Sequence, residues 1–219
     1  MTNDKRQPHK PYTEEDDSPI SKLSDIDFTG VYSYANYLRW EIDERLELIR
    51  GRIYKMGTPS STHQRVSGAL FFKLYLYLEH KTCEVFSAPF DVRLTHDATD
   101  DAAVTTVVQP DICVICDLDK VDDRGCLGAP DIMIEILSPS NNKKELDIKF
   151  HLYEEFGIKE YWVIHPFNER IMKYELDTTG KYTISSQFTS DSEFTSALLP
   201  DFKLNLSELF ARSRARGKA

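Results

Sequence analysis

Apolar positions follow two different periods along the chain, and each period predicts a different kind of element. Short segments rich in β-branched and aromatic residues predict strands. Segments in which apolar residues recur every three or four positions predict helices. The predicted strands are residues 46–49, 52–56, 83–86, 90–94, 107–115, 131–137, 161–164, 170–176 and 181–184, and the predicted helices run from residues 58–62 to about His80 and over 144–156.

Turn and capping residues set the limits of these elements. Gly51 lies between the first two strands and Gly180 between the last two, and glycine in such a turn is typical of a β-hairpin. Residues 58–62 supply Ser and Thr N-cap residues for the first helix, and Gly157 provides a C-cap for the second. We therefore expect one hairpin near the N-terminus, another near the C-terminus, and two helices between them.

Two of the predicted strands, 107–115 and 131–137, are nearly continuous runs of apolar residues. Strands of this composition are covered on both faces. The second leads into the helix 144–156 and then into the strand 161–164, which makes a strand–helix–strand unit. This order of elements predicts the α/β fold class.

The two ends of the chain differ from the part between them. Residues 1–27 are polar, contain three prolines and an acidic run, and predict a mostly disordered tail. Residues 212–219 form a short basic tail, which would either touch phosphates or fray. We interpret residues 28–211 as a single domain, since a chain of 219 residues suits one domain and can bury a core of its own.

Two acidic residues interrupt the apolar central strands. Asp111 follows Pro110 in the first strand, and Glu135 has apolar neighbours on both sides in the second. Buried strands normally exclude charge, so each acid is held in a structural ion pair or hydrogen bond, or is used in a site. Two carboxylates held close repel each other unless a proton or a cation lies between them, and Mg²⁺ prefers such an oxygen site.

A lysine falls among the apolar positions of the helix 144–156. At about 100° per residue, Lys149 lies in the same arc as Leu146, Phe150 and Tyr153. Its ammonium would either escape to solvent along the aliphatic stem or lie beside Asp111 and Glu135. In the second case it would stabilise charge or orient a water molecule.

Three further residues are weaker candidates on pattern alone. Glu47 alternates with Leu46 and Leu48, so the pattern favours a solvent-facing side chain. His63 lies near a helix N-terminus, where backbone N–H groups and Arg65 could meet a phosphate, although a capping or surface histidine is an equal alternative.

A second Pro-Asp pair and the cysteines give no further site. Asp131 lies on the strand of Glu135 but about 13 Å away, too far to share one metal. Cys113 and Cys116 would point to opposite faces of a strand, which argues against a zinc or redox pair.

Composition limits the class of protein. The chain has 27 Lys and Arg against 36 Asp and Glu, and the net charge of −9 argues against a protein that coats nucleic acid through bulk charge. It does not exclude a small carboxylate site that acts on nucleic acid through a metal. With no apolar run of about 18 residues and no leader segment, we expect a cytoplasmic protein, no membrane association and reduced cysteines.

Several segments together resemble the Uma-type restriction endonuclease family, a branch of the PD-(D/E)XK nuclease superfamily. The resemblance covers roughly residues 35–210, and its most specific part is Glu-Ile-Leu-Ser-Pro-Ser at 135–140 with its spacing from Pro110-Asp111. The segments that carry it are residues 47–51, 60–65, 88–94, 108–112, 128–140, 147–153 and 157–164.

The resemblance implies a restriction-endonuclease-like fold, in which helices flank a central mixed β-sheet, and Mg²⁺-dependent cleavage of phosphodiesters. Asp111 matches the motif aspartate and Glu135 the acidic residue of the (D/E)XK element. The position two after Glu135 is Leu137 and not lysine, so Lys149 on the following helix would take the lysine's place. Glu47 matches an early glutamate that often completes such a site.

These observations predict a metal-dependent endonuclease that acts on nucleic acid, DNA in the first place. Asp111 and Glu135, with help from Glu47, would bind Mg²⁺, for which Mn²⁺ could substitute, and the bound ion would activate water. The main alternative is a catalytically inactive nucleic-acid- or protein-binding module on the same fold. We also expect a homodimer, for which the strand 161–164 and the closing hairpin would offer an apolar surface.

Overall fold

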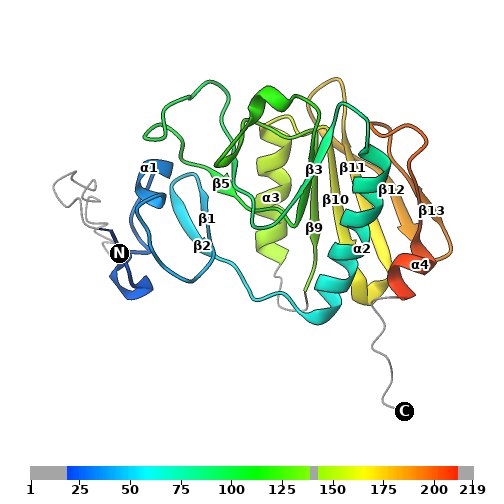
Figure 1. Cartoon of the computed structure of the whole chain (residues 1–219), viewed down its shortest axis with the longest axis horizontal. Coiled ribbons are helices and arrows are strands. Elements are labelled where there is room, and N and C mark those ends of the chain that lie inside the picture. The colour runs from blue at the N-terminus through cyan, green and yellow to red at the C-terminus, as the bar shows by residue number, and fades with distance from the viewer. Residues whose placement is uncertain (1–18, 139–142, 212–219) are drawn as a thin grey trace, which may run out of the picture. The chain divides into compact units, whose positions relative to one another are not determined.

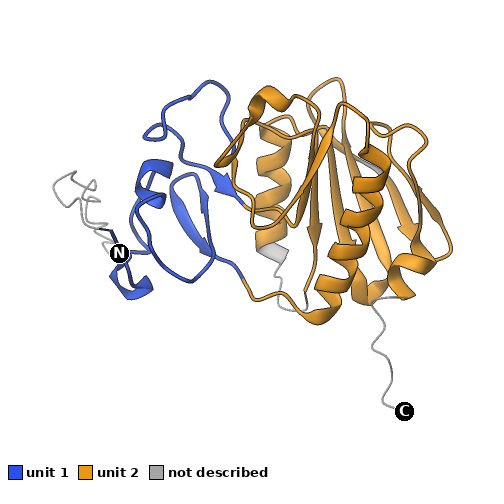
Figure 2. Ribbon diagram, in the orientation of Figure 1, with its two compact units in different colours: residues 1–56, 93–108 blue, residues 57–92, 109–219 orange. Residues whose placement is uncertain are grey.

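The computed structural model describes residues 19–138 and 143–211 (Figure 1). They divide into two compact units (Figure 2): residues 1–56 with 93–108, and residues 57–92 with 109–219. The sequence predicted one domain over 28–211 without this division. Of the predicted N-terminal tail, residues 1–18 lie outside the described residues, as do residues 212–219 of the basic tail. Within 19–27 there is a short 3₁₀ helix, η1 (Leu23–Asp25), and Ile26 is buried.

Unit 1 is built around the predicted N-terminal hairpin. Strands β1 (Leu46–Ile49) and β2 (Arg52–Lys55) pair antiparallel, and β5 (Val107–Val108) adds to the other side of β1. Arg50 and Gly51 both have positive φ, which matches the twist of a two-residue hairpin turn. The short helix α1 (Tyr34–Tyr37) completes the unit, and β4 (Val92–Arg93) lies at its junction with unit 2.

Unit 2 contains a six-stranded mixed sheet in the order β12-β11-β10-β9-β6-β3. Strands β9 and β10 are parallel, and every other neighbouring pair is antiparallel. The sheet's strands are β3 (Glu84–Ser87), β6 (Ile112–Ile115), β9 (Ile132–Ile136), β10 (Glu160–His165), β11 (Arg170–Leu176) and β12 (Tyr182–Thr189). The parallel pair confirms the predicted strand–helix–strand unit, since a crossover helix must connect two parallel neighbours.

Helices cover both faces of this sheet (Figure 1). On one face, Val66, Leu70 and Leu74 of α2 (Ser61–Leu78) pack into a core with the isoleucines of β6 and β9. On the other, Tyr153 of α3 (Lys143–Glu155) contacts the ring of Tyr161 on β10. Both faces are therefore apolar, which explains the nearly continuous apolar runs of β6, β9 and β10.

Local signals place the two helices where the sequence predicts them. Ser60 is the N-cap of α2, and its hydroxyl accepts a hydrogen bond from the backbone N–H of His63. Gly157 has a φ of +74°, the left-handed conformation that favours glycine just beyond a helix C-terminus. Residues 139–142, which precede α3, lie outside the described residues.

The predicted strand 107–115 is two strands in the structure. β5 ends at Val108 and belongs to unit 1, and β6 begins at Ile112 in unit 2. Gln109, Pro110 and Asp111 separate them, and Pro110 has no N–H to donate to a sheet ladder. The prediction was wrong because an apolar run does not reveal which sheet each half joins.

The C-terminal segment packs on the face that α2 covers. It consists of the hairpin β13 (Glu193–Thr195) and β14 (Lys203–Asn205) and the helix α4 (Leu206–Ala211). Phe194 contacts the ring of Trp162 on β10, and Leu206, Leu209 and Phe210 are buried in the same core. The smaller elements of unit 2 are the strands β7 (Val121–Asp122) and β8 (Gly125–Leu127) and the 3₁₀ helices η2 (Leu118–Lys120) and η3 (Pro166–Asn168).

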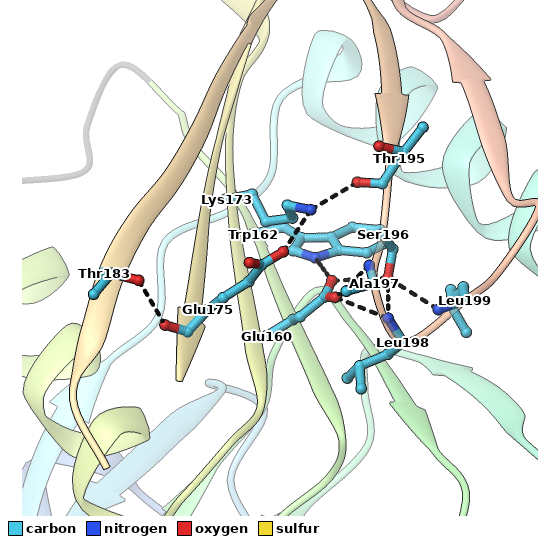
Figure 3. Close-up of polar contacts among 10 residues, drawn as sticks. All are labelled: Glu160, Trp162, Lys173, Glu175, Thr183, Thr195, Ser196, Ala197, Leu198 and Leu199. Atoms are coloured by element: carbon cyan, nitrogen blue, oxygen red, sulfur yellow. Dashed lines mark hydrogen bonds and ion pairs between the residues drawn. The ribbon is translucent and has the colours of Figure 1, made fainter. Parts of the chain in front are cut away.

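Buried polar side chains attach this segment to the sheet (Figure 3). The carboxylate of Glu160, at the start of β10, accepts hydrogen bonds from Ser196 Oγ and from the backbone N–H groups of Ala197 and Leu198. Trp162 Nε1 donates to the same carboxylate at 2.7 Å. A buried charge of this kind is tolerated because its lone pairs are used by fixed donors.

The expectation of reduced cysteines is wrong for two of the four. Cys83 and Cys116 form a disulfide. The cause is register: Glu84 pairs with Ile115 in the antiparallel ladder of β3 and β6, so Cys83 and Cys116 occupy the next pair of positions. Cys113 and Cys126 are free and buried.

Of the surface predicted for a homodimer, the strand 161–164 is not available, whereas the closing hairpin ends in β12 at the edge of the sheet and its role stays a prediction. Strand β10 lies between β9 and β11, and Tyr161, Trp162, Val163 and Ile164 are all buried. The apolar run 161–164 is a central strand of the core, which an apolar pattern alone does not distinguish from an interface. Among the described residues, no helix has the length and apolar character needed to cross a membrane.

Candidate active site

The candidate site lies where β6 and β9 run side by side. Asp111 directly precedes β6, and Glu135 is the fourth residue of β9. The antiparallel register pairs Ile112 with Ile134, which places Asp111 opposite Glu135 at the next step of the ladder. Two acidic residues that are 24 positions apart in the sequence are therefore neighbours. The sequence had predicted that they lie on adjacent strands.

The carboxylate of Asp111 is held from two directions. Its Oδ2 accepts a hydrogen bond from the backbone N–H of Ile136 at 2.7 Å, so it is fixed against the strand that carries Glu135. Its Oδ1 lies 3.0 Å from Nε2 of His63, in the first turn of α2. An ionised carboxylate offers about four lone-pair positions, so these two contacts leave acceptor capacity for a further ligand.

The carboxylate of Glu135 is held by α3. Lys149 Nζ lies 2.8 Å from Oε1 in an ion pair whose two side chains are each 12% exposed. The hydroxyl of Tyr153 donates to the same oxygen at 2.8 Å. Lys149 and Tyr153 are four positions apart, so they lie one above the other on the face of α3 that meets the sheet.

The structure places Lys149 beside Glu135, one of the two acids predicted to lie next to it. Its ammonium contacts Glu135 and does not escape to solvent, as the snorkelling alternative would require. A pair of charges so little exposed is stable only with good geometry and additional hydrogen bonds, and Tyr153 supplies one of them. The catalytic role assigned to Lys149 stays a prediction.

His63 lies in the first turn of α2, as the sequence predicted, but its side chain is not at the surface. Its side chain is buried, so it is not a surface histidine, and its imidazole contacts Asp111. Arg65 is exposed and lies two positions further on, which is about 200° around the helix from His63. The structure therefore does not bring His63 and Arg65 to one face, and phosphate binding by either stays a prediction.

Glu47 is buried and not solvent-facing. It lies on β1 in unit 1, where all four residues of the strand are buried, and its side chain is 5% exposed. The alternation with Leu46 and Leu48 misled because both faces of β1 are covered. A role for Glu47 in binding a metal stays a prediction.

Sequence reasoning missed one residue of this site, Tyr153, and one contact, between His63 and Asp111. Tyr153 was assigned to the apolar arc of its helix, but its hydroxyl bonds to Glu135. The spacing could have indicated this contact, because a residue four positions after Lys149 lies on the same face of the helix. The contact between His63 and Asp111 joins residues 48 positions apart, and only the packing of α2 against the sheet reveals it.

The second Pro-Asp pair is structural, as expected. Asp131 accepts a hydrogen bond from the backbone N–H of Cys116 and forms an ion pair with Lys159. Burial raises the pKa of the Cys113 thiol well above its ordinary value, and the nearby Cys126 raises it further.

The donor chemistry of the site suits a hard divalent cation. Asp111 and Glu135 offer carboxylate oxygens, and Mg²⁺ is commonly bound through one or two carboxylates, with water and substrate phosphate as its other ligands. Within residues 19–138 and 143–211, no group of three or more His, Cys, Asp and Glu side chains is arranged to bind a metal. The fit therefore rests on two carboxylates, with Lys149 as a fixed positive charge beside them.

Comparison with solved structures supports the fold. The chain is similar to a crystal structure from Anabaena variabilis described as "a putative nuclease belonging to DUF820", with a TM-score of 0.66 and 17% sequence identity. The alignment covers 83% of this chain and 99% of that one. The predicted α/β fold, a mixed sheet flanked by helices with a hairpin at either end, is thereby confirmed.

Two curated relatives come from Synechocystis sp. The uncharacterized protein slr1290 is 25% identical over 162 residues, which are 73% of this chain and 82% of the relative. The uncharacterized protein sll1609 is 28% identical over 152 residues, which are 67% of this chain and 82% of the relative. Neither name carries an activity.

The family comparison covers most of the chain. The model of the family Uma2, described as "Putative restriction endonuclease", matches residues 34–207. This range contains Asp111, Glu135, Lys149 and Tyr153, and also the β1 strand of unit 1. The chain belongs to the Uma2 family.

Proposed function

We propose that this protein is a Mg²⁺-dependent endonuclease that hydrolyses phosphodiester bonds in DNA. The observation that carries the proposal is the group formed by Asp111, Glu135 and Lys149: two carboxylates from paired strands and an ammonium from the following helix. Membership of a family described as restriction endonucleases supports the substrate class. The remaining steps follow from what each side chain can do.

Asp111 and Glu135 would bind the metal. The backbone N–H of Ile136 fixes Asp111 in place, so little reorganisation is needed for its remaining lone pairs to meet a cation. When bound, Mg²⁺ would supply a water of lowered pKa and neutralise charge on the scissile phosphate. Glu47 remains a candidate for a further ligand.

Lys149 would act on the substrate side of this reaction. Its ammonium is held 2.8 Å from Glu135, so it would lie near a water or a phosphate oxygen that bound to a metal on this carboxylate. A fixed positive charge in a site with little solvent stabilises the negative charge that develops in the transition state. Tyr153 would keep the carboxylate of Glu135 oriented while Lys149 exchanges partners.

The acidic character of the chain fits a metal-dependent contact with DNA. With a net charge of −9, the protein has no bulk attraction for phosphates, and both site carboxylates would repel them. A divalent ion would reverse the local charge. We therefore expect weak binding of DNA in EDTA and a strong dependence on Mg²⁺.

The test is a cleavage screen with supercoiled plasmid, linear duplex, single-stranded DNA and RNA. Purified protein should cut DNA with Mg²⁺ or Mn²⁺ and not with EDTA. Asp111→Asn and Lys149→Met should each lower the rate at least about 100-fold, since each removes a charge that the reaction uses. Cleavage of RNA alone would correct the substrate class.

The chain offers matched controls for both substitutions. Asp131 also follows a proline and precedes a strand, and Lys159 forms an ion pair with it. Asp131→Asn and Lys159→Met should therefore cut as fast as the parent. If Asp111→Asn and Lys149→Met also cut at the parental rate, the assignment of the site is wrong.

Binding of the metal can be measured without any substrate. A ligand that binds only the folded state raises its melting temperature. Mg²⁺ or Mn²⁺ should raise the melting temperature of the parent and of Asp131→Asn, and should have little effect on Asp111→Asn. No metal-dependent shift and no cleavage of any substrate would favour the alternative, a binding module on the same fold.

A further inference from the structure

Helix α2 has two apolar faces, of which the sheet covers one. Val66, Leu70, Leu74 and Leu78 are buried against β6 and β9. On the opposite side the side chains of Phe72, Tyr75 and Leu76 are 59%, 55% and 50% exposed. Scattered exposed apolar residues are ordinary, but a contiguous group of large ones marks an interaction surface.

These residues form one continuous stripe. Positions 68, 69, 72, 75 and 76 recur at three- and four-residue spacing and fall within about 60° of Phe72 around the helix. We call Gly68, Ala69, Phe72, Tyr75 and Leu76 the α2 stripe. A Cβ added to Gly68 would meet no atom within 4 Å, so the stripe is open to another backbone at Gly68, whereas Ala69 is half-buried at the border between the stripe and the core.

Opposite charges stand at the two ends of the stripe. Arg65 precedes it and Glu79 follows it, and both lie within about 20° of the line of Phe72. Both residues are exposed. Over the described part of the chain, neither side chain takes part in a hydrogen bond or ion pair. The stripe therefore has a positive end, an aromatic centre and a negative end.

We propose that the α2 stripe is a homodimer interface, in which α2 packs antiparallel against α2 of a second copy about a two-fold axis at Phe72. An isologous interface must be complementary to itself. Rotation about Phe72 places Gly68 against Leu76 of the second copy and Ala69 against its Tyr75, so small residues meet large ones. The same rotation places Arg65 of each copy against Glu79 of the other, so the interface contains two such pairs.

This pattern favours a second copy over an unrelated partner. An arbitrary partner requires no relation between the two halves of the stripe, but here each half supplies what the other lacks. The two aromatic rings at the axis would provide the buried anchor, and the Arg65–Glu79 pairs at the rim would fix the antiparallel orientation. A parallel arrangement would set like charges against each other.

Sedimentation velocity of the full-length protein between about 1 and 100 μM tests the proposal. The parent should change from monomer to dimer over this range. Phe72→Glu removes the aromatic anchor and places two carboxylates at the two-fold axis. The dissociation constant of the dimer should therefore rise about tenfold or more. Because Phe72 is exposed, circular dichroism should show an unchanged fold.

Leu38→Glu is the control, since Leu38 is a 46% exposed apolar residue of unit 1. It should dimerise as the parent does. A parent that stays monomeric at every concentration, or a dimer that Phe72→Glu does not weaken, would overturn the proposal. A monomeric parent would leave the stripe to a partner of another sequence.

Charge reversal tests the antiparallel orientation. Arg65→Glu and Glu79→Arg should each weaken the dimer by about fivefold, because each sets two like-charged pairs together. The double variant should regain parental affinity, and about 0.5 M salt should reduce all these differences. Failure of the double variant to recover would contradict the antiparallel pairing.

Discussion

Two glutamates on neighbouring parallel strands occupy opposite faces of the same sheet. Glu135 on β9 faces α3, and Glu160 on β10 faces the C-terminal segment. Around Glu160, neutral donors from one stretch of backbone and from Trp162 contact both carboxylate oxygens (Figure 3). Around Glu135, a lysine and a tyrosine contact one oxygen.

The difference lies in the kind of donor: Glu160 is held by neutral groups, whereas a charged side chain is among the partners of Glu135. A buried charge surrounded by fixed neutral donors has nothing further to bind. A carboxylate paired with an ammonium can exchange that partner for a cation or for a water molecule. The sequence singled out Glu135 as an acid in an apolar strand, but Glu160 lay just outside the predicted strand 161–164.

The largest expected effect is on the rate of cleavage in Glu135→Gln. The amide cannot bind a cation as the carboxylate does, so the rate should fall at least about 100-fold. The amide oxygen still accepts from Lys149 and Tyr153, so urea unfolding should show a smaller loss of stability than in Glu160→Gln. A variant that cuts like the parent would remove the distinction between the two glutamates.

Glu160→Gln should show the opposite pattern. Either orientation of the amide sets an NH₂ group against donors that now contact an oxygen, so the free energy of unfolding should fall by about 2–4 kcal/mol. Below the melting temperature the rate of cleavage should equal that of the parent. Urea denaturation would measure the loss of stability, and the plasmid assay on the same preparation would measure the rate of cleavage. A lowered rate in folded Glu160→Gln would contradict the prediction.

Tyr153→Phe should have an intermediate effect that is confined to Glu135. Loss of the hydroxyl removes one of two donors to Oε1 and should cost about 1–2 kcal/mol of stability. We expect a rate lowered by about tenfold with an unchanged KM, because Tyr153 orients the carboxylate and does not bind substrate. An effect on KM alone would instead indicate contact with DNA.

The smallest effect concerns Glu154, a third carboxylate, at the edge of α3. The Lys181 ammonium and the backbone N–H of Tyr182 hold its pKa below the ordinary value. A lowered folded-state pKa stabilises the fold above the unfolded-state pKa of about 4.3, and the stabilisation disappears as the pH falls through the folded value. The stability difference between parent and Glu154→Gln should therefore be present near neutral pH and vanish in acid. A pH-independent difference would mean that packing, and not charge, is responsible.

Much of the fold could be predicted because its signals are local. The Arg50-Gly51 turn, the Ser60 cap and Gly157 each fix an element limit within a few residues. The strand–helix–strand unit followed from apolar runs on either side of an amphipathic helix. The division at Pro110 could not be predicted, since the two halves of one apolar run join different units.

For the site, the sequence indicated which residue types were unusual but not all their partners. Lys149 could be placed because the helical period is regular. The contact of His63 with Asp111 depends on how α2 crosses the sheet, and the burial of Glu47 depends on what covers β1. Both are properties of packing between distant segments, which no local pattern encodes.

The hydrogen bonds to the Glu160 carboxylate also limit how far the chain can be shortened from its C-terminus. Ser196, Ala197 and Leu198 come late in the sequence, yet they supply the donors for a charge in the middle of the core. During synthesis, β10 and β11 are complete well before these residues exist. The central sheet is therefore left with an exposed, incompletely paired carboxylate until the last 24 of the 219 residues are made, and a protein truncated before Ser196 should aggregate.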